Sequence, residues 1–247
     1  MAVNQKINCG VYERTNNGRF NLPRNGQCFL CLSRLEMGES LLCPACSNDL
    51  PRNNKACTSC AAPIVYGAIC ANCMQSPGRN IQNTFCAFRY EYPASLMIRH
   101  MKFHSRLDIV AFFGGQLANY VSQQMRRLPD CIIPVPLHSS RTMGRGFNQS
   151  LALARVIAGI NGVPVDYKAC ARIQNTTAQT GLSAQQRRRN IKGAFAIDGG
   201  LFPEYKHVTI IDDVVTTGST VNELARVLSL AGIEKIDVWA CARASVN

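Results

Sequence analysis

The most informative stretch of the sequence is Val208-Thr209-Ile210-Ile211-Asp212-Asp213-Val214-Val215-Thr216-Thr217-Gly218-Ser219-Thr220. An apolar run leads into two adjacent acids, and a short hydroxyl-rich loop follows them. Apolar residues then recur at helical spacing from Val221 to Leu228. The pattern predicts a buried strand over 208–211, a loop, and a helix that ends near Gly232. In an open α/β sheet, ligands bind at the carboxyl ends of the strands, where such a loop would lie.

The chemistry of this loop suits a phosphate that is attached to a sugar. Backbone N–H groups at the start of a helix bind phosphate, and Gly218 permits a close approach. Two carboxylates just upstream, Asp212 and Asp213, can accept the hydroxyls of the sugar. The simpler alternative is that the loop only caps a helix and the two acids only mark the end of the strand. A helix cap alone, however, needs no paired acids. Further donors are the hydroxyls of Thr216, Thr217, Ser219 and Thr220.

Strands and helices alternate through the second part of the chain. This order predicts a mainly parallel sheet that is covered by helices on both faces. The expected strands are 85–90, 131–135, 208–211 and 236–242, with 163–172 extended. The expected helices are 94–103, 107–128, 148–160 and 183–191, and one that includes 221–228.

The first third of the chain is rich in cysteine. The chain has 13 cysteines, and eight of them form four C-x-x-C pairs: Cys28/Cys31, Cys43/Cys46, Cys57/Cys60 and Cys70/Cys73. Two such turns complete a tetrahedral zinc site, so we expect two structural Zn²⁺ ions. Sequential pairing is preferred, with the first four cysteines on one ion and the last four on the other, although spacing also permits a crossed arrangement. Metal would supply much of the folding energy here.

Other readings of these cysteines stay open. The pairs could serve redox chemistry, or the segment could have lost its metal. Closed four-thiolate sites have no open position, so a structural role is the usual one. Four further cysteines fall on strand-like segments and are expected in the core: Cys86, Cys131, Cys170 and Cys241. Cys9 lies in an expected tail and has no assigned role.

Composition excludes several classes of protein. The 247 residues are 47% apolar and 17% charged, which indicates a folded chain. The start of the chain lacks the apolar core of a signal peptide, and the run 109–125 is too polar to span a membrane. We therefore expect a cytoplasmic protein without membrane insertion. The expected segments are a tail (1–25), a cysteine module (26–76), a linker (77–83) and an α/β domain (84–247).

The chain is strongly basic, with 27 basic and 15 acidic residues and a formal charge of +12. A polyanion is a plausible partner, and a generally basic surface is the plainer explanation. Cations serve either a pyrophosphate leaving group or single-stranded nucleic acid. The candidates for nucleic-acid binding are Arg99, Lys102 and Arg106, which share one helix face, and Arg187, Arg188 and Arg189. His100 and His104 are assigned no catalytic role.

The segment 208–220 resembles the PRPP (phosphoribosyl pyrophosphate) signature of type I phosphoribosyltransferases. This resemblance implies that Asp212 and Asp213 are catalytic acids that bind the ribose hydroxyls, with Mg²⁺ accompanying PRPP. It also implies that Thr216, Thr217, Gly218, Ser219 and Thr220 hold the 5-phosphate. Pyrophosphate would be bound by Pro134, Val135, Pro136, Leu137 and Arg145.

A wider resemblance covers roughly residues 27–243. Arg145-Gly146-Phe147-Asn148-Gln149, Gln179-Thr180-Gly181-Leu182, Arg187-Arg188-Arg189-Asn190 and Ala194-Phe195 follow the cysteine module as in the ComF family. This resemblance implies a role in natural transformation, in the handling of incoming single-stranded DNA. A helicase-like ATPase or a recombination mediator is an implied partner. The alternative is an active phosphoribosyltransferase that transfers ribose 5-phosphate from PRPP to an unidentified acceptor.

Overall fold

The computed structural model describes residues 26–36, 38, 41–75, 80–138, 147–174, 184–197 and 205–245; for residues 184, 185, 187 and 188 it describes the backbone. The chain forms two compact units, which divide between Asp49 and Leu50. The last four cysteines of the module therefore belong to the same unit as the sheet. The boundaries expected from composition (26–76, 77–83 and 84–247) stay a prediction.

Four parallel strands form the central sheet in the order β1-β6-β5-β2. The outer strands are β1 (Asn83–Arg89) and β2 (Cys131–Pro134), and the inner strands are β5 (His207–Val215) and β6 (Lys235–Arg243). Their apolar residues are buried almost without interruption, as expected for a parallel sheet covered on both faces. The predicted α/β class is confirmed. β5 extends beyond the predicted 208–211, so Asp212 and Asp213 lie within the strand rather than after it.

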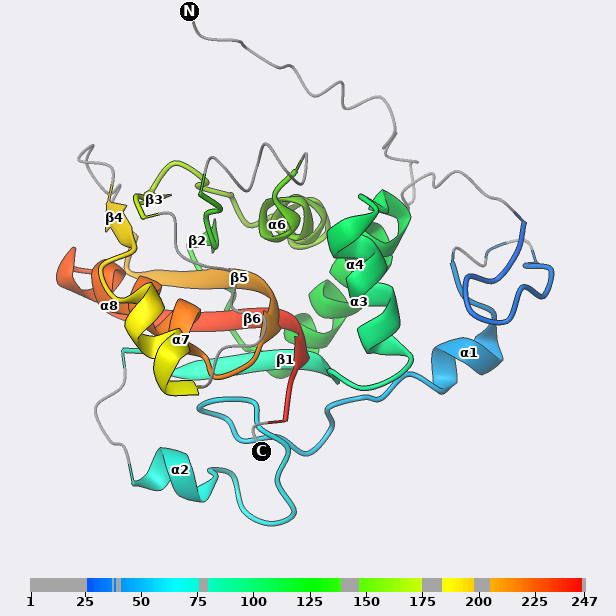
Figure 1. Ribbon diagram of the computed structural model, residues 1–247, viewed down its shortest axis with the longest axis horizontal. Helices are drawn as coiled ribbons and strands as arrows, with labels where there is room; N and C mark the ends of the chain where they lie inside the picture. The colour runs from blue at the N-terminus through cyan, green and yellow to red at the C-terminus, as the bar shows by residue number, and fades with distance from the viewer. Residues whose placement is uncertain are drawn as a thin grey trace, which may run out of the picture. The chain divides into compact units, whose positions relative to one another are not determined.

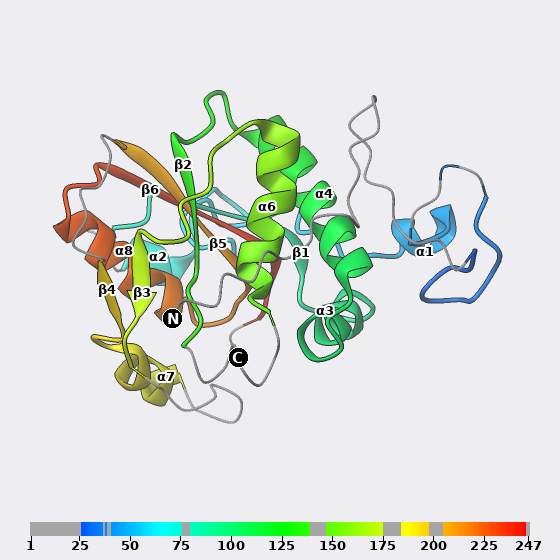
Figure 2. The ribbon, with the colours of Figure 1, turned by 90° about the horizontal axis from the view of Figure 1, so that it is seen from above.

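Helices cover both faces of the sheet (Figure 1). The helices α4 (Leu107–Gln124) and α6 (Gln149–Asn161) pack on one face, and α8 (Ser219–Leu230) packs on the other (Figure 2). α4 and α6 approach closely because Gly114 has no side chain: a Cβ there would lie 2.6 Å from Val156 Cγ1. The helix α3 (Ala94–Phe103) packs against α4 and has the predicted bounds.

Each edge of the sheet is covered by a further segment of the chain. Beside β1, Asn53 N–H donates to Ala87 O and Arg89 N–H donates to Pro51 O. Beside β2, Ile132 N–H donates to Pro164 O. Such cover prevents edge-to-edge pairing with other chains. It also means that the chain runs along the sheet edge immediately before it enters the second cysteine group.

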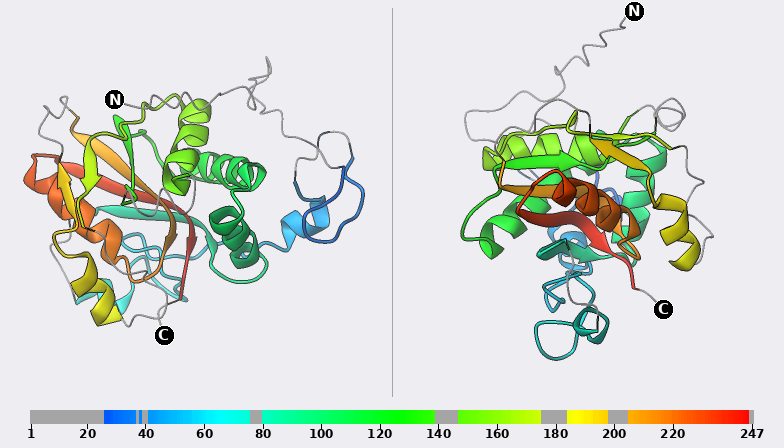
Figure 3. Two further views of the ribbon diagram at one scale, coloured as in Figure 1. Left: turned by 45° about the horizontal axis from the view of Figure 1, so that its top comes forward. Right: turned by 90° about the vertical axis from the view of Figure 1, so that its left-hand side faces the viewer.

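Several predicted bounds differ from the structure. The helix expected over 107–128 ends at Gln124, because Met125 is extended and Leu128 precedes a proline, which disfavours helix. Most of 163–172 is irregular: β3 (Cys170–Arg172) pairs with β4 (Phe195–Ile197) in a separate antiparallel sheet that the sequence did not predict (Figure 3). The basic helix is present as α7 (Ala184–Ile191).

Two short helices in the cysteine module, α1 (Pro44–Asn48) and α2 (Ala71–Met74), each begin directly after a cysteine. The four cysteines expected in the core are buried. Within the described parts of the chain, the structure contains no helix that is both long and apolar enough to cross a membrane.

Candidate functional site

The two acids lie near the carboxyl end of β5, where two helices reach them. Asp212 accepts hydrogen bonds from the Ser150 hydroxyl of α6 (3.3 Å) and from the N–H of Asp213 (2.9 Å). Asp213 is 8% exposed and forms an ion pair with Lys102 of α3, with 3.1 Å between Nζ and Oδ1. Lys102 was predicted from the sequence to bind nucleic acid, whereas the structure places its ammonium group at the acids.

This cluster has unusual proton affinities. Burial, together with the adjacent Asp213, raises the pKa of Asp212 to about 7. Burial works against the charge on Lys102, but the carboxylates of Asp213 and Asp212 outweigh it and raise the pKa of Lys102. The cluster thus combines a charged ammonium group with a carboxyl group that titrates near neutrality. Such tuned groups are typical of functional sites.

The loop that follows the acids turns sharply at Gly218, whose φ is 76°. A side chain there would be strained, and its Cβ would lie 3.0 Å from Asn222 Nδ2. The Ser219 N–H donates to Thr217 Oγ1, and the two hydroxyls lie 2.7 Å apart. α8 starts at Ser219, so Thr220 lies in its first turn. This loop, residues 216–220, is called the phosphate loop below, after the role predicted for it from the sequence.

A segment around Asn148 ties the surroundings of the acids together. The Asn148 side chain caps α6 by accepting from Leu151 N–H, and it donates to Val135 O (3.1 Å). The next side chain, Gln149, donates to Lys102 O (3.3 Å) and is buried. Residue 150 then supplies the hydroxyl that reaches Asp212. The sequence analysis assigned no role to Gln149 or Ser150, although the polar run at a predicted helix start was the available signal.

The segment 134–137 runs from the end of β2 beside β5. Val135 N–H donates to Ile211 O (2.9 Å), and Val135 is buried. Pro136 and Leu137 are half-buried. Arg145 and the segment 179–182 lie outside the described residues.

The basic candidates have separate surroundings. Arg99 is exposed on α3, one helical turn before the exposed Phe103. Arg106 directly precedes α4 without a side-chain capping hydrogen bond, and it forms an ion pair with Asp108. Arg189 is exposed on α7, while the side chains of Arg187 and Arg188 lie outside the described residues.

The cysteines come together in sequential groups: Cys28, Cys31, Cys43 and Cys46, then Cys57, Cys60, Cys70 and Cys73. Within each group all sulfur atoms lie within 4.8 Å of one another. Cys31 and Cys43 have their sulfurs 3.7 Å apart, and so do Cys60 and Cys70. Zn–S bonds of about 2.3 Å in a tetrahedron require sulfurs about 3.8 Å apart. Both groups therefore fit a zinc ion.

Main-chain groups favour the thiolate form that zinc needs. Cys43 N–H donates to Cys28 Sγ, and Cys70 N–H donates to Cys57 Sγ. Burial opposes a charge on Cys57, but the N–H groups of Cys70, Cys60 and Ser59 lower the pKa of this thiol to about 7. A thiol of this acidity releases its proton readily when a metal binds.

Comparison with known proteins agrees with the metal assignment. A double zinc ribbon domain matches residues 19–74. Two solved structures share similarity with part of the chain. The match to the glutamine PRPP amidotransferase of Bacillus subtilis covers 58% of this chain and 30% of that protein (TM-score 0.39, 16% identity). The match to the purine phosphoribosyltransferase of Pyrococcus horikoshii covers 56% of this chain and 82% of that protein (TM-score 0.29, 17% identity).

Curated relatives match nearly the whole chain. The DNA utilization protein YhgH of Salmonella typhimurium is 35% identical over 223 residues, which cover 88% of this chain and 97% of the relative. Competence protein F of Haemophilus influenzae is 34% identical over 228 residues, covering 89% and 98%. Competence protein ComFC of Streptococcus pneumoniae is 22% identical over 218 residues, covering 87% and 93%. With its double zinc ribbon and α/β domain, the chain belongs to the ComF family.

Proposed function

We propose that this protein handles single-stranded DNA during natural transformation in the cytoplasm, and that its phosphate loop and acids form a pocket for PRPP with Mg²⁺. The single observation that carries the pocket is the convergence of Lys102, Ser150 and the acid pair directly before the phosphate loop. A plain strand end and helix cap would need none of these partners. The names of the relatives support the DNA part of the proposal.

Each part of PRPP has a counterpart in the pocket. The 5-phosphate binds the N–H groups and hydroxyls of the phosphate loop, and the ribose hydroxyls donate to the carboxylates of Asp212 and Asp213. Pyrophosphate lies toward the segment 134–137, with Arg145 as a further cation. Mg²⁺ binds largely through substrate phosphates and water, so it needs few protein ligands, and it neutralises charge on the pyrophosphate.

Calorimetric titration of zinc-loaded protein with PRPP and Mg²⁺ tests the pocket. We expect saturable binding, about tenfold or more tighter than that of ribose 5-phosphate, because pyrophosphate adds charge-assisted contacts. Ribose 5-phosphate serves as the matched control, since it keeps the groups that the acids and the phosphate loop bind. If neither compound binds a folded, zinc-loaded sample, the pocket proposal is wrong.

The DNA proposal draws on the formal charge of +12 and on the exposed face of α3. Arg99 and Phe103 are adjacent on this face, at i and i+4, and Phe103 is 65% exposed. A cation beside an aromatic ring is the arrangement that stacks a base and neutralises its phosphate. The family resemblance implies a helicase-like ATPase or a recombination mediator as a further partner.

Binding of a fluorescent oligothymidine, followed by anisotropy, tests this interface. With about three phosphate contacts, the affinity should fall more than tenfold between 50 and 200 mM salt. Changing Arg99→Ala together with Phe103→Ala should weaken binding about tenfold or more. The matched control is Arg127→Ala, which removes an arginine whose side chain is 86% exposed after α4. Equal losses in both variants would contradict a specific role for α3.

An active phosphoribosyltransferase is the second candidate function, favoured by the ion pair beside an acid that titrates near neutrality. In such a reaction the C1–pyrophosphate bond breaks, and the acids stabilise the cationic sugar that forms. Release of pyrophosphate in the presence of an acceptor, such as a nucleobase, would support this function. PRPP binding without release for any acceptor would favour a ligand-binding role alone.

A further inference from the structure

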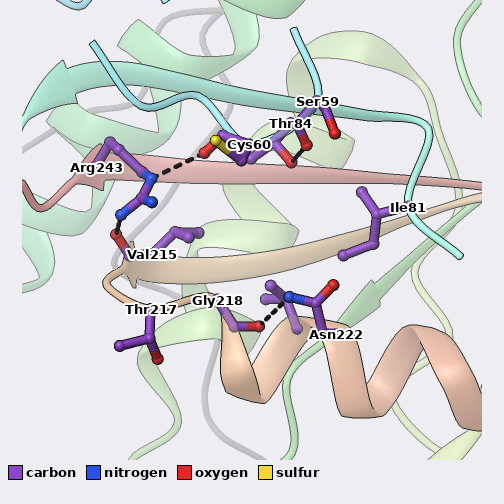
Figure 4. Close-up of a pocket in the computed structure, with 10 residues that line it drawn as sticks. Ser59, Cys60, Ile81, Thr84, Val215, Thr217, Gly218, Asn222 and Arg243 are labelled. Carbon is purple, nitrogen blue, oxygen red and sulfur yellow. Dashed lines mark hydrogen bonds between the residues drawn. The ribbon is translucent and has the colours of Figure 1, made fainter. Parts of the chain in front are cut away.

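A single buried arginine connects the second cysteine group with the phosphate loop. Arg243 is the last residue of β6 and is 5% exposed. Its Nε donates to Cys60 O (2.8 Å). Its Nη1 donates to Val215 O (3.0 Å), Thr216 O and Ala244 O (2.6 Å). Figure 4 shows the guanidinium between Cys60 and the end of β5.

Two of the acceptors of Arg243 belong to different candidate functional parts of the chain. Cys60 is a thiolate ligand of the second zinc site, and Thr216 is the first residue of the phosphate loop. A guanidinium is planar and holds its donors in a fixed fork, so one orientation serves the carbonyls of both parts. A buried carbonyl that lost this partner would be left unsatisfied, which is costly. Movement of either part is therefore opposed by the other.

The cysteine turn is also held by the sheet. Thr84 of β1 donates through its N–H to Thr58 O (2.9 Å) and through its hydroxyl to Ser59 O (2.8 Å). These bonds fix the turn to β1 but do not touch the phosphate loop. The hydrogen bonds of Arg243, by contrast, join the turn to the loop.

The surroundings of the two parts share a buried apolar cluster, which includes Ala61 and Val215. A small pocket of about 30 Å³ lies between them, and Ser59, Cys60, Thr217, Gly218, Asn222 and Arg243 are among its lining residues (Figure 4). Asn222 acts on the loop side alone, where it donates to Gly218 O.

We propose that Arg243 is a positioning residue that couples the second zinc site to the phosphate loop, so that metal at Cys57, Cys60, Cys70 and Cys73 and a sugar phosphate at residues 216–220 each strengthen the binding of the other. The ligand half of this inference rests on the proposed function. Coupling of this kind is reciprocal, and its usual size is about 5- to 150-fold.

The experiment uses the full chain with Cys28→Ser and Cys31→Ser, so that one four-thiolate site remains. Co²⁺ is titrated in the presence and absence of saturating ribose 5-phosphate, and thiolate-to-cobalt absorption reports the metal affinity. In this background we expect about fivefold or more tighter Co²⁺ binding with ribose 5-phosphate. Arg243→Lys, which keeps the charge but loses the fork, should reduce this ratio to about one.

Two matched variants separate coupling from general destabilisation. Arg226→Lys makes the same exchange on α8, where the arginine pairs with Glu223, and it should leave the ratio unchanged. Thr84→Val releases Ser59 O and should weaken Co²⁺ binding while the ratio persists. A ratio that falls equally in Thr84→Val and Arg243→Lys would overturn the role of Arg243.

Hydrogen exchange keeps the inference testable without a ligand. With metal bound, the amides of residues 216–220 should exchange about fivefold or more faster in Arg243→Lys than in Arg226→Lys, while those of α6 should match. If neither ribose 5-phosphate nor PRPP with Mg²⁺ binds but this difference is present, the proposed pocket fails and the positioning role survives. If ribose 5-phosphate binds while the ratio is one and exchange is unchanged, the proposed pocket survives and the coupling is wrong.

Discussion

Cys57→Ser together with Cys60→Ser should lower the thermal midpoint of the unit that contains the sheet by about 10 °C or more, whereas Cys28→Ser together with Cys31→Ser should leave this midpoint within about 2 °C. A structural zinc site contributes on the order of 10 kcal/mol of folding free energy. In a domain of this size, about 1 kcal/mol shifts the midpoint by 2–4 °C. Loss of even part of the zinc energy therefore gives a large shift.

The asymmetry follows from where the two groups lie. The first group belongs to the unit that ends at Asp49, and the second belongs to the unit with the sheet. Carbonyls of the second group accept hydrogen bonds from Thr84 and Arg243, so loss of metal also disturbs β1 and β6. The first group lies outside this unit, so we expect its loss to leave the midpoint of the sheet unit nearly unchanged.

Calorimetry on zinc-loaded samples measures both midpoints, and elemental analysis confirms the metal content. We expect two zinc ions per chain in the wild type and one in each double variant. The two variants control for each other, because each removes one C-x-x-C pair. Equal shifts in both would show that the groups contribute alike to the sheet unit, and no shift in either would show that metal does not stabilise it.

The sequence could predict the features that depend on local patterns. Apolar runs between turn residues gave the four parallel strands, and helical spacing gave α3 and α8 within a few residues. The four C-x-x-C pairs gave both metal groups, because two thiolates on one turn are a local signal. The phosphate loop was equally accessible, since a strand, two acids and a glycine follow one another directly.

Features that depend on distant contacts could not be read from the sequence. Lys102 was assigned to a nucleic-acid surface because its neighbours Arg99 and Arg106 are basic. Its ion pair with Asp213 joins residues more than a hundred positions apart, and it forms only when α3 packs beside the sheet. The contact between Arg243 and Cys60 is more distant still. The pairing of β3 with β4 was missed because each strand is only three residues long.

Asparagine at Asp212 should remove most of the pH dependence of Mg²⁺–PRPP binding between pH 6 and pH 8. The pKa of this carboxyl is raised to about 7. The Asp212 carboxyl is therefore ionised in about a tenth of the molecules at pH 6 and in about nine tenths at pH 8. The ribose hydroxyls donate to the carboxylate, so wild-type affinity should rise roughly ninefold over this range. The phosphate groups of PRPP also titrate, and the pH dependence that remains in Asp212→Asn measures their contribution to binding.

The variant should also bind PRPP more weakly at pH 8, by about 10- to 100-fold, because a hydrogen bond to a charged acceptor is lost. Asp212→Asn together with Asp213→Asn should lower the affinity by more than about 100-fold and leave Lys102 without its ion pair. Calorimetric titrations at several pH values give both quantities. A wild type and an Asp212→Asn variant with parallel pH profiles would contradict ribose binding by an ionised Asp212.

The stability of the protein without ligand gives an independent measure of the pKa of the Asp212 carboxyl. A carboxyl whose pKa is raised by folding stabilises the fold at pH values below its unfolded pKa, near 3.8, and this contribution is lost as the pH rises through about 7. Asp212→Asn carries no such titration. The thermal midpoint of the wild type should therefore fall relative to that of the variant between pH 5 and pH 8. A constant difference would mean that Asp212 has an ordinary pKa in the folded protein. Its carboxyl group would then already be ionised at neutral pH, and it could accept the ribose hydroxyls without first releasing a proton.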